Sequence, residues 1–160
     1  MYNYSKSKYG YYDGSLNNLA YRKEGLKKEI YIYDGPHCIA KYDGSGNLIS
    51  EYIYGPNIDE ILLRIDKDGK RYYFHQDGIN SVIAITDNSG KKVVLYLYNI
   101  YGKIKETKGS LKNNILFTAR WLDKTTNLYY YRARWYDAED GRFISKDPIG
   151  FNGGDWNLYR

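Results

Sequence analysis

The chain has 160 residues, with 24 basic and 19 acidic side chains and a formal net charge of +5. This length suits one domain or a piece of a larger protein. A hydrophobic fraction of 42% excludes disorder over the whole length, and no run of about 18 apolar residues is present to span a membrane. So mild a charge does not single out nucleic acid, which is not an expected partner.

Cysteine and histidine are too few for a disulfide or a metal site. Cys38 has no second cysteine to pair with, and together with His37 and His75 it falls short of a typical zinc site. We therefore expect no metal, no cofactor and an inert Cys38. The first residues lack a basic segment followed by an apolar stretch, so no secretory signal peptide is expected in this chain.

In chain order, several segments alternate aromatic or β-branched residues and end in Asp, Asn or Gly, which predicts strands joined by tight turns. The expected strands are 30–33, 48–54, 71–75, 81–86, 93–98 and 128–136. The lysine-rich run 103–114 is expected to be a solvated hairpin or loop. No window carries a long helical period with caps, so the predicted fold class is all-β, with antiparallel hairpins and little helix.

The turns recur at a regular spacing. Asp-x-x-Gly turns lie at 43–46, 66–69 and 87–90. A Tyr-x-Tyr pair follows the first and the third of them, at 52–54 and 96–98. Tyr-Asp-Gly triplets at 12–14, 33–35 and 42–44 fit the same scheme. The turns thus recur about every 20 residues, and a period of this size indicates repeat architecture, in which each unit buries its face against its neighbours.

These Tyr-Asp repeats, together with several later segments, resemble the Rhs/YD-repeat proteins and the core segment that closes them. The segments that carry the resemblance are 74–90, 117–123, 129–137, 141–150 and 153–160. The resemblance implies a β-sheet that spirals into a hollow shell. It assigns 1–65 to YD-type repeat units and 66–160 to the Rhs-associated core, which stops before a second Asp-Pro-x-Gly.

The resemblance also implies a function. In such proteins a variable toxin or effector domain follows the core and is held inside the shell, so the expected partners are a C-terminal effector and the remaining shell of a parent protein. The expected place of action is outside the cell or at its surface. Because open sheet edges pair with other strands, self-association of the isolated chain is expected as well.

Some members of the family cut their own chain just downstream of the core with two aspartates. By resemblance, Asp147 in Asp-Pro-Ile-Gly is the first of them and Arg134 supports it. Aspartyl cleavage needs two carboxylates that share a proton, so Asp147 alone predicts no enzyme activity for this chain. Asp137, Asp140 and Asp155 are the nearby carboxylates that could substitute for the second aspartate.

Two alternatives concern the aromatic stretch. If 128–136 is one strand, Arg132 and Arg134 lie on the same face and either meet solvent or share an acidic partner such as Asp147. The rings of Tyr129, Tyr130, Tyr131 and Trp135 beside these arginines could bind a cell-surface glycan. The alternative is a set of cross-strand ring ladders in the core, which the 21 tyrosines favour.

Three other positions are predicted to be structural or strained. His75 lies close to Asp77 but has no nucleophile beside it, so a structural histidine is expected. The family often has glycine where this chain has Asn80 and Ala119. Asn tolerates a left-handed backbone, whereas Ala119 is strained if its φ is positive.

Overall fold

The computed structural model describes residues 7–11 and 18–160, which form two antiparallel β-sheets. In the first sheet each strand pairs with the next one in chain order: β1(Ser7–Tyr11), β2(Leu19–Glu24), β3(Lys27–Asp34), β4(His37–Asp43), β5(Leu48–Tyr54), β6(Ile61–Asp66), β7(Arg71–Gln76), β8(Val82–Asp87), β9(Lys92–Tyr98) and β10(Ile104–Gly109). The second sheet contains β11(Trp121–Asp123), β12(Leu128–Tyr131), β13(Arg134–Asp137) and β14(Arg142–Phe143). Among the described residues, helix is limited to two short 3₁₀ segments, η2(Phe117–Ala119) and η3(Gly150–Gly153). The all-β prediction is confirmed.

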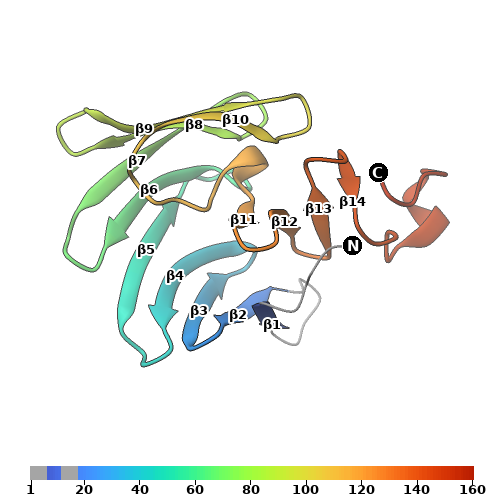
Figure 1. Ribbon diagram of the computed structural model, residues 1–160, viewed down its shortest axis with the longest axis horizontal. Helices are drawn as coiled ribbons and strands as arrows, with labels where there is room; N and C mark the ends of the chain where they lie inside the picture. Colours follow the sequence, from blue (N-terminus) through green and yellow to red (C-terminus); the bar gives the residue numbers. More distant parts are fainter. Residues whose placement is uncertain (1–6, 12–17) are drawn as a thin grey trace.

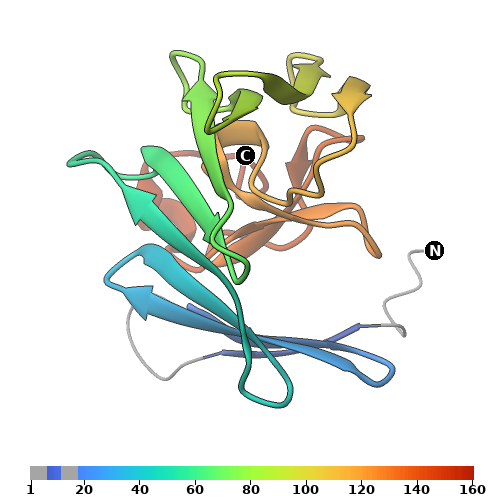
Figure 2. The same ribbon diagram turned by 90° about the vertical axis from the view of Figure 1, so that its left-hand side faces the viewer.

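The first sheet, here called the wall, curls around the second, here called the closing sheet (Figures 1 and 2). Repeated β-bulges accompany this curvature. Every hairpin that opens with an odd-numbered strand, from β1–β2 to β9–β10, shifts register near the start of its second strand. The extra residues are Ala20, Ile39, Leu62, Ile83 and Lys105. The β4–β5 and β8–β9 pairs shift register as well. A bulge bends its strand and increases the local twist, so these repeated bulges bend the wall.

Five turns of the wall share one backbone geometry. In each, the amide of the fourth residue donates to the carbonyl of the first, and the fourth residue has a positive φ. These fourth residues are Gly46, Gly69, Asn80, Gly90 and Gly102. The three predicted Asp-x-x-Gly turns are confirmed, and two further turns replace one of their key residues with Asn. Asn80 takes the left-handed conformation that the sequence predicts for it, with φ 63°. The Tyr-Asp-Gly triplet at 12–14 lies outside the described residues.

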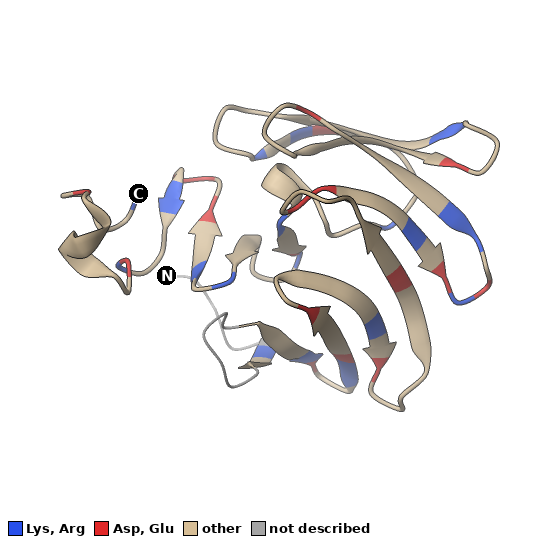
Figure 3. Cartoon of the chain, turned by 180° about the vertical axis from the view of Figure 1, so that it is seen from behind, with Lys and Arg blue, Asp and Glu red and all other residues tan. Residues whose placement is uncertain are grey.

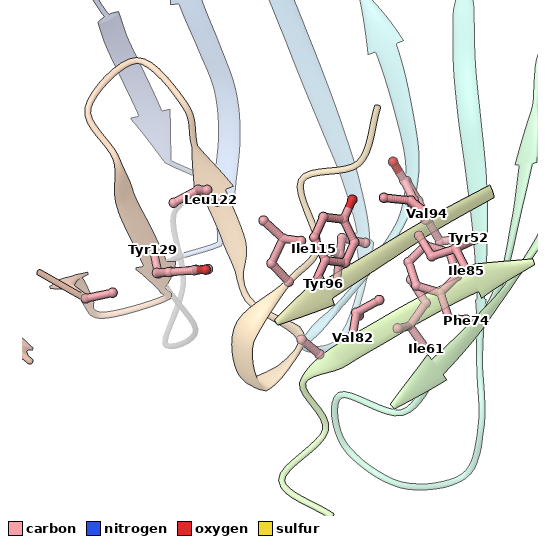
Figure 4. Close-up of a cluster of buried hydrophobic side chains, with 13 residues drawn as sticks. Tyr52, Ile61, Phe74, Val82, Ile85, Val94, Tyr96, Ile115, Leu122 and Tyr129 are labelled. Atoms are coloured by element: carbon pink, nitrogen blue, oxygen red, sulfur yellow. The ribbon is translucent and has the colours of Figure 1, made fainter. Parts of the chain in front are cut away.

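The core lies between the wall and the closing sheet (Figure 4). Tyr52 and Tyr96, one from each predicted Tyr-x-Tyr pair, point into it from β5 and β9. On the other side of the core lie Ile115, from the segment before the closing sheet, and Leu122 and Tyr129 from the closing sheet itself. Period-two alternation puts one face of each wall strand into this core. The tyrosines therefore supply buried area, as the structural interpretation of the aromatic residues predicts.

The stretch 128–136 corrects one sequence prediction. It is a hairpin and not one strand, because the chain reverses at Arg132-Ala133 and Tyr131 pairs with Arg134. Arg132 has a φ of 59°, which ends the strand. The prediction that Arg132 and Arg134 lie on one strand face is wrong. Residues 104–109 of the lysine-rich run form the exposed edge strand β10, as the predicted solvated hairpin requires. The end of the run differs, because Asn113 is buried and Leu111 packs against the core.

Lysine and arginine are interspersed with aspartate and glutamate over both sheets (Figure 3). The wall continues without a break across residues 65 and 66, so the division into repeat units and core stays a prediction drawn from the resemblance. No helix within 7–11 and 18–160 is long and apolar enough to cross a membrane.

Candidate functional site

Arg134 and Asp147, which the resemblance pairs, lie together in the structure. Arg134 Nη2 is 3.0 Å from Asp147 Oδ2, and both side chains are largely shielded from solvent. The guanidinium carbon also lies 3.6 Å from the centre of the Phe143 ring, a favourable cation–π position. Arg134 Nη1 donates to the backbone carbonyls of Leu158 and Arg160, each at 3.2 Å. Arg134 therefore joins β13, the Asp-Pro turn and the last residues of the chain.

The backbone around Asp147 is held in a defined turn. Asp147 Oδ1 accepts from the amide of Ile149 at 2.9 Å, and the Asp147 carbonyl accepts from the amide of Gly150. The Asp147 amide donates to the Leu158 carbonyl at 2.8 Å. Gly150 has a φ of 62°, which explains why glycine closes the Asp-Pro-Ile-Gly motif. The turn presents Asp147 Oδ2 to Arg134 alone among the described charged side chains.

The three carboxylates that could complete an aspartate pair are engaged elsewhere. Asp137 is buried, and its Oδ1 accepts from the amides of Glu139 and Asp140. The Asp140 carboxylate faces Arg142, and Asp155 caps its own turn. No hydrogen bond joins any of them to Asp147 in the part of the chain that the structure describes. The geometry therefore holds one carboxylate with its arginine, and the catalytic role of Asp147 and Arg134 stays a prediction.

The remaining candidates are structural. Tyr129 and Tyr130 are buried, so they do not form an exposed sugar-binding platform. His75 Nε2 lies 3.0 Å from Thr86 Oγ1, whereas Asp77 accepts from backbone amides of its own turn. Burial raises the pKa of the Cys38 thiol to about 12, so this cysteine stays a neutral thiol. Within the described ranges, no group of three or more His, Cys, Asp or Glu side chains could hold a metal ion.

Ion pairs between the wall and the closing sheet are the feature that sequence reasoning missed. Arg22 on β2 pairs with Asp123 on β11, with Nε 2.9 Å from Oδ2, and Tyr9 donates to the same carboxylate. Asp59, in the turn before β6, accepts two hydrogen bonds from Arg120 at 3.0 and 2.6 Å and a third from Arg132 at 2.8 Å. A sequence pattern cannot predict these pairs, because partners about 60 to 100 positions apart meet only through tertiary folding.

Electrostatics supports these contacts as fixed parts of the fold. Burial alone would raise the pKa of Asp123, but the hydrogen bonds from Arg22 and Tyr9 outweigh it and hold the pKa below its usual value. The pKa of Arg120 is lowered, first by burial and then by the nearby Arg132, although Asp59 opposes the shift. Charged groups that are shielded from solvent to this degree stabilise the fold only while their partners of opposite charge are in place. Docking of the closing sheet therefore depends on both acidic residues.

Comparison with known proteins places this geometry in a family. The Teneurin YD-shell family model matches residues 2–153. The tRNA3(Ser)-specific nuclease WapA of Bacillus spizizenii is 34% identical over 78% of this chain. The double-stranded DNA deaminase toxin A of Burkholderia cenocepacia is 28% identical over 86% of it. The chain spans only 6% and 10% of the lengths of these two relatives.

Solved structures show the same fold. The crystal structure of TcdB2-TccC3-Cdc42 superposes on 98% of this chain with a TM-score of 0.64 and 18% sequence identity, and the match spans 10% of that chain. The Tc holotoxin pore of Photorhabdus luminescens matches the same share with a TM-score of 0.62 and 19% identity, over 9% of its chain. The resemblance to Rhs/YD-repeat proteins is confirmed, and the chain belongs to the Teneurin YD-shell family.

Proposed function

We propose that this chain is the wall end and closing segment of a β-shell that encloses a toxin or effector domain of the same parent protein. The observation that carries the proposal is the docking of the closing sheet on the concave side of the wall (Figure 2). A curved sheet covered at one end forms the end of a container. Two of the relatives are named as a tRNA nuclease and a DNA deaminase toxin, which supports a toxic cargo.

The wall is built to continue. Among the described strands, β1 and β10 each have a neighbour on one side only, so each leaves a row of backbone groups unpaired. In the proposed parent protein, further repeat units extend the wall. The cargo and the site of action outside the cell are part of this proposal, because the chain spans so little of its relatives.

Protease protection tests the enclosure. We would prepare the parent protein with its effector and digest it with a nonspecific protease. We expect an intact effector fragment from the wild type and rapid digestion of the effector in Asp123→Asn, which loosens the closing sheet. Asp68→Asn, at an exposed wall turn, is the control and should protect like the wild type. Equal digestion of the effector in all three proteins would contradict the proposal.

A second function, self-cleavage, is favoured by the Arg134–Asp147 pair. Aspartyl cleavage needs two carboxylates, and the second one must come from further along a longer chain. In that longer protein, Asp147→Asn should leave one uncut product, and Asp155→Asn should be cut normally. Cleavage that persists in Asp147→Asn would exclude this role.

Self-association follows from the open edges. Edge strands pair with other strands unless they are protected, and β10 carries lysines that oppose such pairing. We therefore expect association of the isolated chain through β1, measured as a rise in mass with concentration by light scattering. A constant monomer mass at high concentration would contradict it. Glycan binding through residues 129–135 has no support, since the central rings are buried.

A further inference from the structure

A small cavity lies between the wall and the closing sheet, beside the ion pairs of Asp59 with Arg120 and Arg132. Its volume is about 20 Å³, enough for one water-sized species. Tyr33 and Tyr54 line it from the wall, Asp59 from the turn before β6, and Arg120, Tyr130 and Arg132 from the closing side. Such a position makes its occupant part of the contact between the two sheets.

The charges around this cavity do not balance. Arg120 and Arg132 both bind the single carboxylate of Asp59, which leaves one positive charge in excess. No other Asp, Glu, Lys or Arg among the described residues lines the cavity. The three side chains are largely shielded, with exposed fractions of 16%, 24% and 16% for Arg120, Arg132 and Asp59. An excess charge in such a setting is costly unless a counter-charge reaches it.

Arg120, which lines the cavity, also carries a donor that no described group accepts. Arg120 Nε is buried and has no hydrogen-bond partner within the described residues, although both of its terminal nitrogens are used by Asp59. The Tyr131 ring lies 5.1 Å from the guanidinium carbon, which favours the cation but leaves Nε–H without an acceptor atom. The small volume, the excess positive charge and the unpaired Arg120 donor therefore favour a compact, negatively charged hydrogen-bond acceptor as the occupant.

We propose that this cavity binds one monovalent halide ion, chloride under ordinary conditions, which links the wall to the closing sheet. A halide has the right charge, accepts hydrogen bonds from every side and is only somewhat larger than a single water molecule. Phosphate, sulfate and carboxylates are too large for about 20 Å³. A water molecule would fill the space but would leave the charge unbalanced. The inference goes beyond the proposed function and does not depend on it.

Bromide provides the direct test. Crystals of the chain soaked in sodium bromide should give an anomalous difference peak in the cavity, beside Arg120. In parallel, thermal unfolding is compared in sodium chloride and sodium gluconate at equal ionic strength, since gluconate is too large to enter. We expect a midpoint about 3 °C higher in chloride at a concentration well above the dissociation constant.

Two variants sharpen the test. Arg132→Gln removes the excess charge, so its midpoints in chloride and gluconate should coincide. Arg22→Gln weakens another contact between the two sheets and should keep the chloride shift, because Asp123 lies outside this cavity. If Arg132→Gln does not fold, the bromide peak in the wild type still decides. Equal midpoints in the wild type, an empty cavity, or bromide found only at the surface as an adventitious ion would each overturn the proposal.

Discussion

The wall and the closing sheet reach their structures by different routes. Wall strands are five to eight residues long and are joined by short turns, several of which repeat one Asx-led geometry. Strands of the closing sheet are two to four residues long. The closing sheet depends on buried rings and on ion pairs to the wall. Local sequence therefore determines the wall, whereas contacts distant in sequence determine the closing sheet.

Backbone strain follows the same division. Left-handed positions in the turns of the wall are mostly glycine, which adopts a positive φ without penalty. In and around the closing sheet, Thr118, Ala119, Asn127 and Arg132 all have positive φ. A non-glycine residue in the left-handed conformation costs about 1–3 kcal/mol of stability, and this conformation persists only where packing holds it. The closing sheet should thus be the part of the molecule that its neighbours stabilise most.

The largest effect is expected at the centre of the contact between the sheets. Tyr129 is 1% exposed, and its hydroxyl donates to the Gly102 carbonyl at 3.0 Å. Tyr129→Ala should lower the free energy of unfolding by about 4 kcal/mol in urea denaturation. The control is Tyr73→Ala on the outer face of the wall, where the ring is 37% exposed and the loss should be below about 1 kcal/mol. Equal losses would contradict a core centred between the sheets.

Two turn glycines separate backbone strain from packing. Gly90 has open space where a Cβ would lie, so Gly90→Ala should cost only the strain of a positive φ, about 1 kcal/mol. At Gly102 a Cβ would lie 2.3 Å from Cδ1 of Phe117, in the segment before the closing sheet. Gly102→Ala should therefore cost about 3 kcal/mol by chemical denaturation. If both variants lose the same amount, the close approach of the turn to Phe117 does not matter.

The Arg22–Asp123 pair should matter more than an ion pair of the wall turns. Asp123→Asn leaves Arg22 with a weaker acceptor in a shielded position, and about 2 kcal/mol of stability should be lost. Asp68→Asn removes the exposed pair with Lys70 and should leave the denaturation midpoint unchanged. A wild-type midpoint for Asp123→Asn would show that this contact does not hold the closing sheet.

Acid should weaken the same contact. The pKa of Asp123 is lower in the fold than its unfolded value, so its stabilisation is complete above the unfolded pKa of about 3.9 and is lost as the pH falls toward the folded pKa. Asp123→Asn should therefore flatten the curve of stability against pH below about pH 4. The measurement is urea denaturation at a series of pH values, and parallel curves for the two proteins would contradict the prediction.

The smallest effect is a gain. Ala119 has a φ of 55°, and the sequence predicts strain there if φ is positive. Ala119→Gly should raise the free energy of unfolding by about 1 kcal/mol, because the relief of strain exceeds the added freedom of the unfolded chain. Asn80→Gly is the comparison, with an expected change near zero since Asn tolerates this conformation. A loss of stability in Ala119→Gly would show that the buried methyl group outweighs the strain.

Sequence reasoning succeeded where the signals are local. The Asp-x-x-Gly turns, the strands beside them and the burial of Tyr52 and Tyr96 follow from turn chemistry and period-two alternation. It failed at Arg132, because the run from Tyr129 to Trp135 contains no Gly, Asn or Pro to mark a turn. There the ion pair with Asp59 stabilises a positive φ that no local signal predicts.

The functional residues also divide into those that the sequence predicted and those that only the structure reveals. The resemblance pairs Arg134 with Asp147, and the structure brings them to 3.0 Å. Residues such as Asp59, Arg120 and Asp123 carry no motif of their own in the sequence. They become visible only when the wall curls far enough to bring β2 and the turn before β6 against the closing sheet. Long-range pairing of this kind is the information that one sequence does not contain.

The most direct test of enclosure is a cryo-electron microscopy reconstruction of the parent protein with its effector. We expect that the wall continues past β1 into further hairpins, that the closing sheet covers the concave side, and that density for the effector lies inside the shell. A reconstruction with the effector outside, or with the concave side of the wall open to solvent, would contradict the proposal of enclosure.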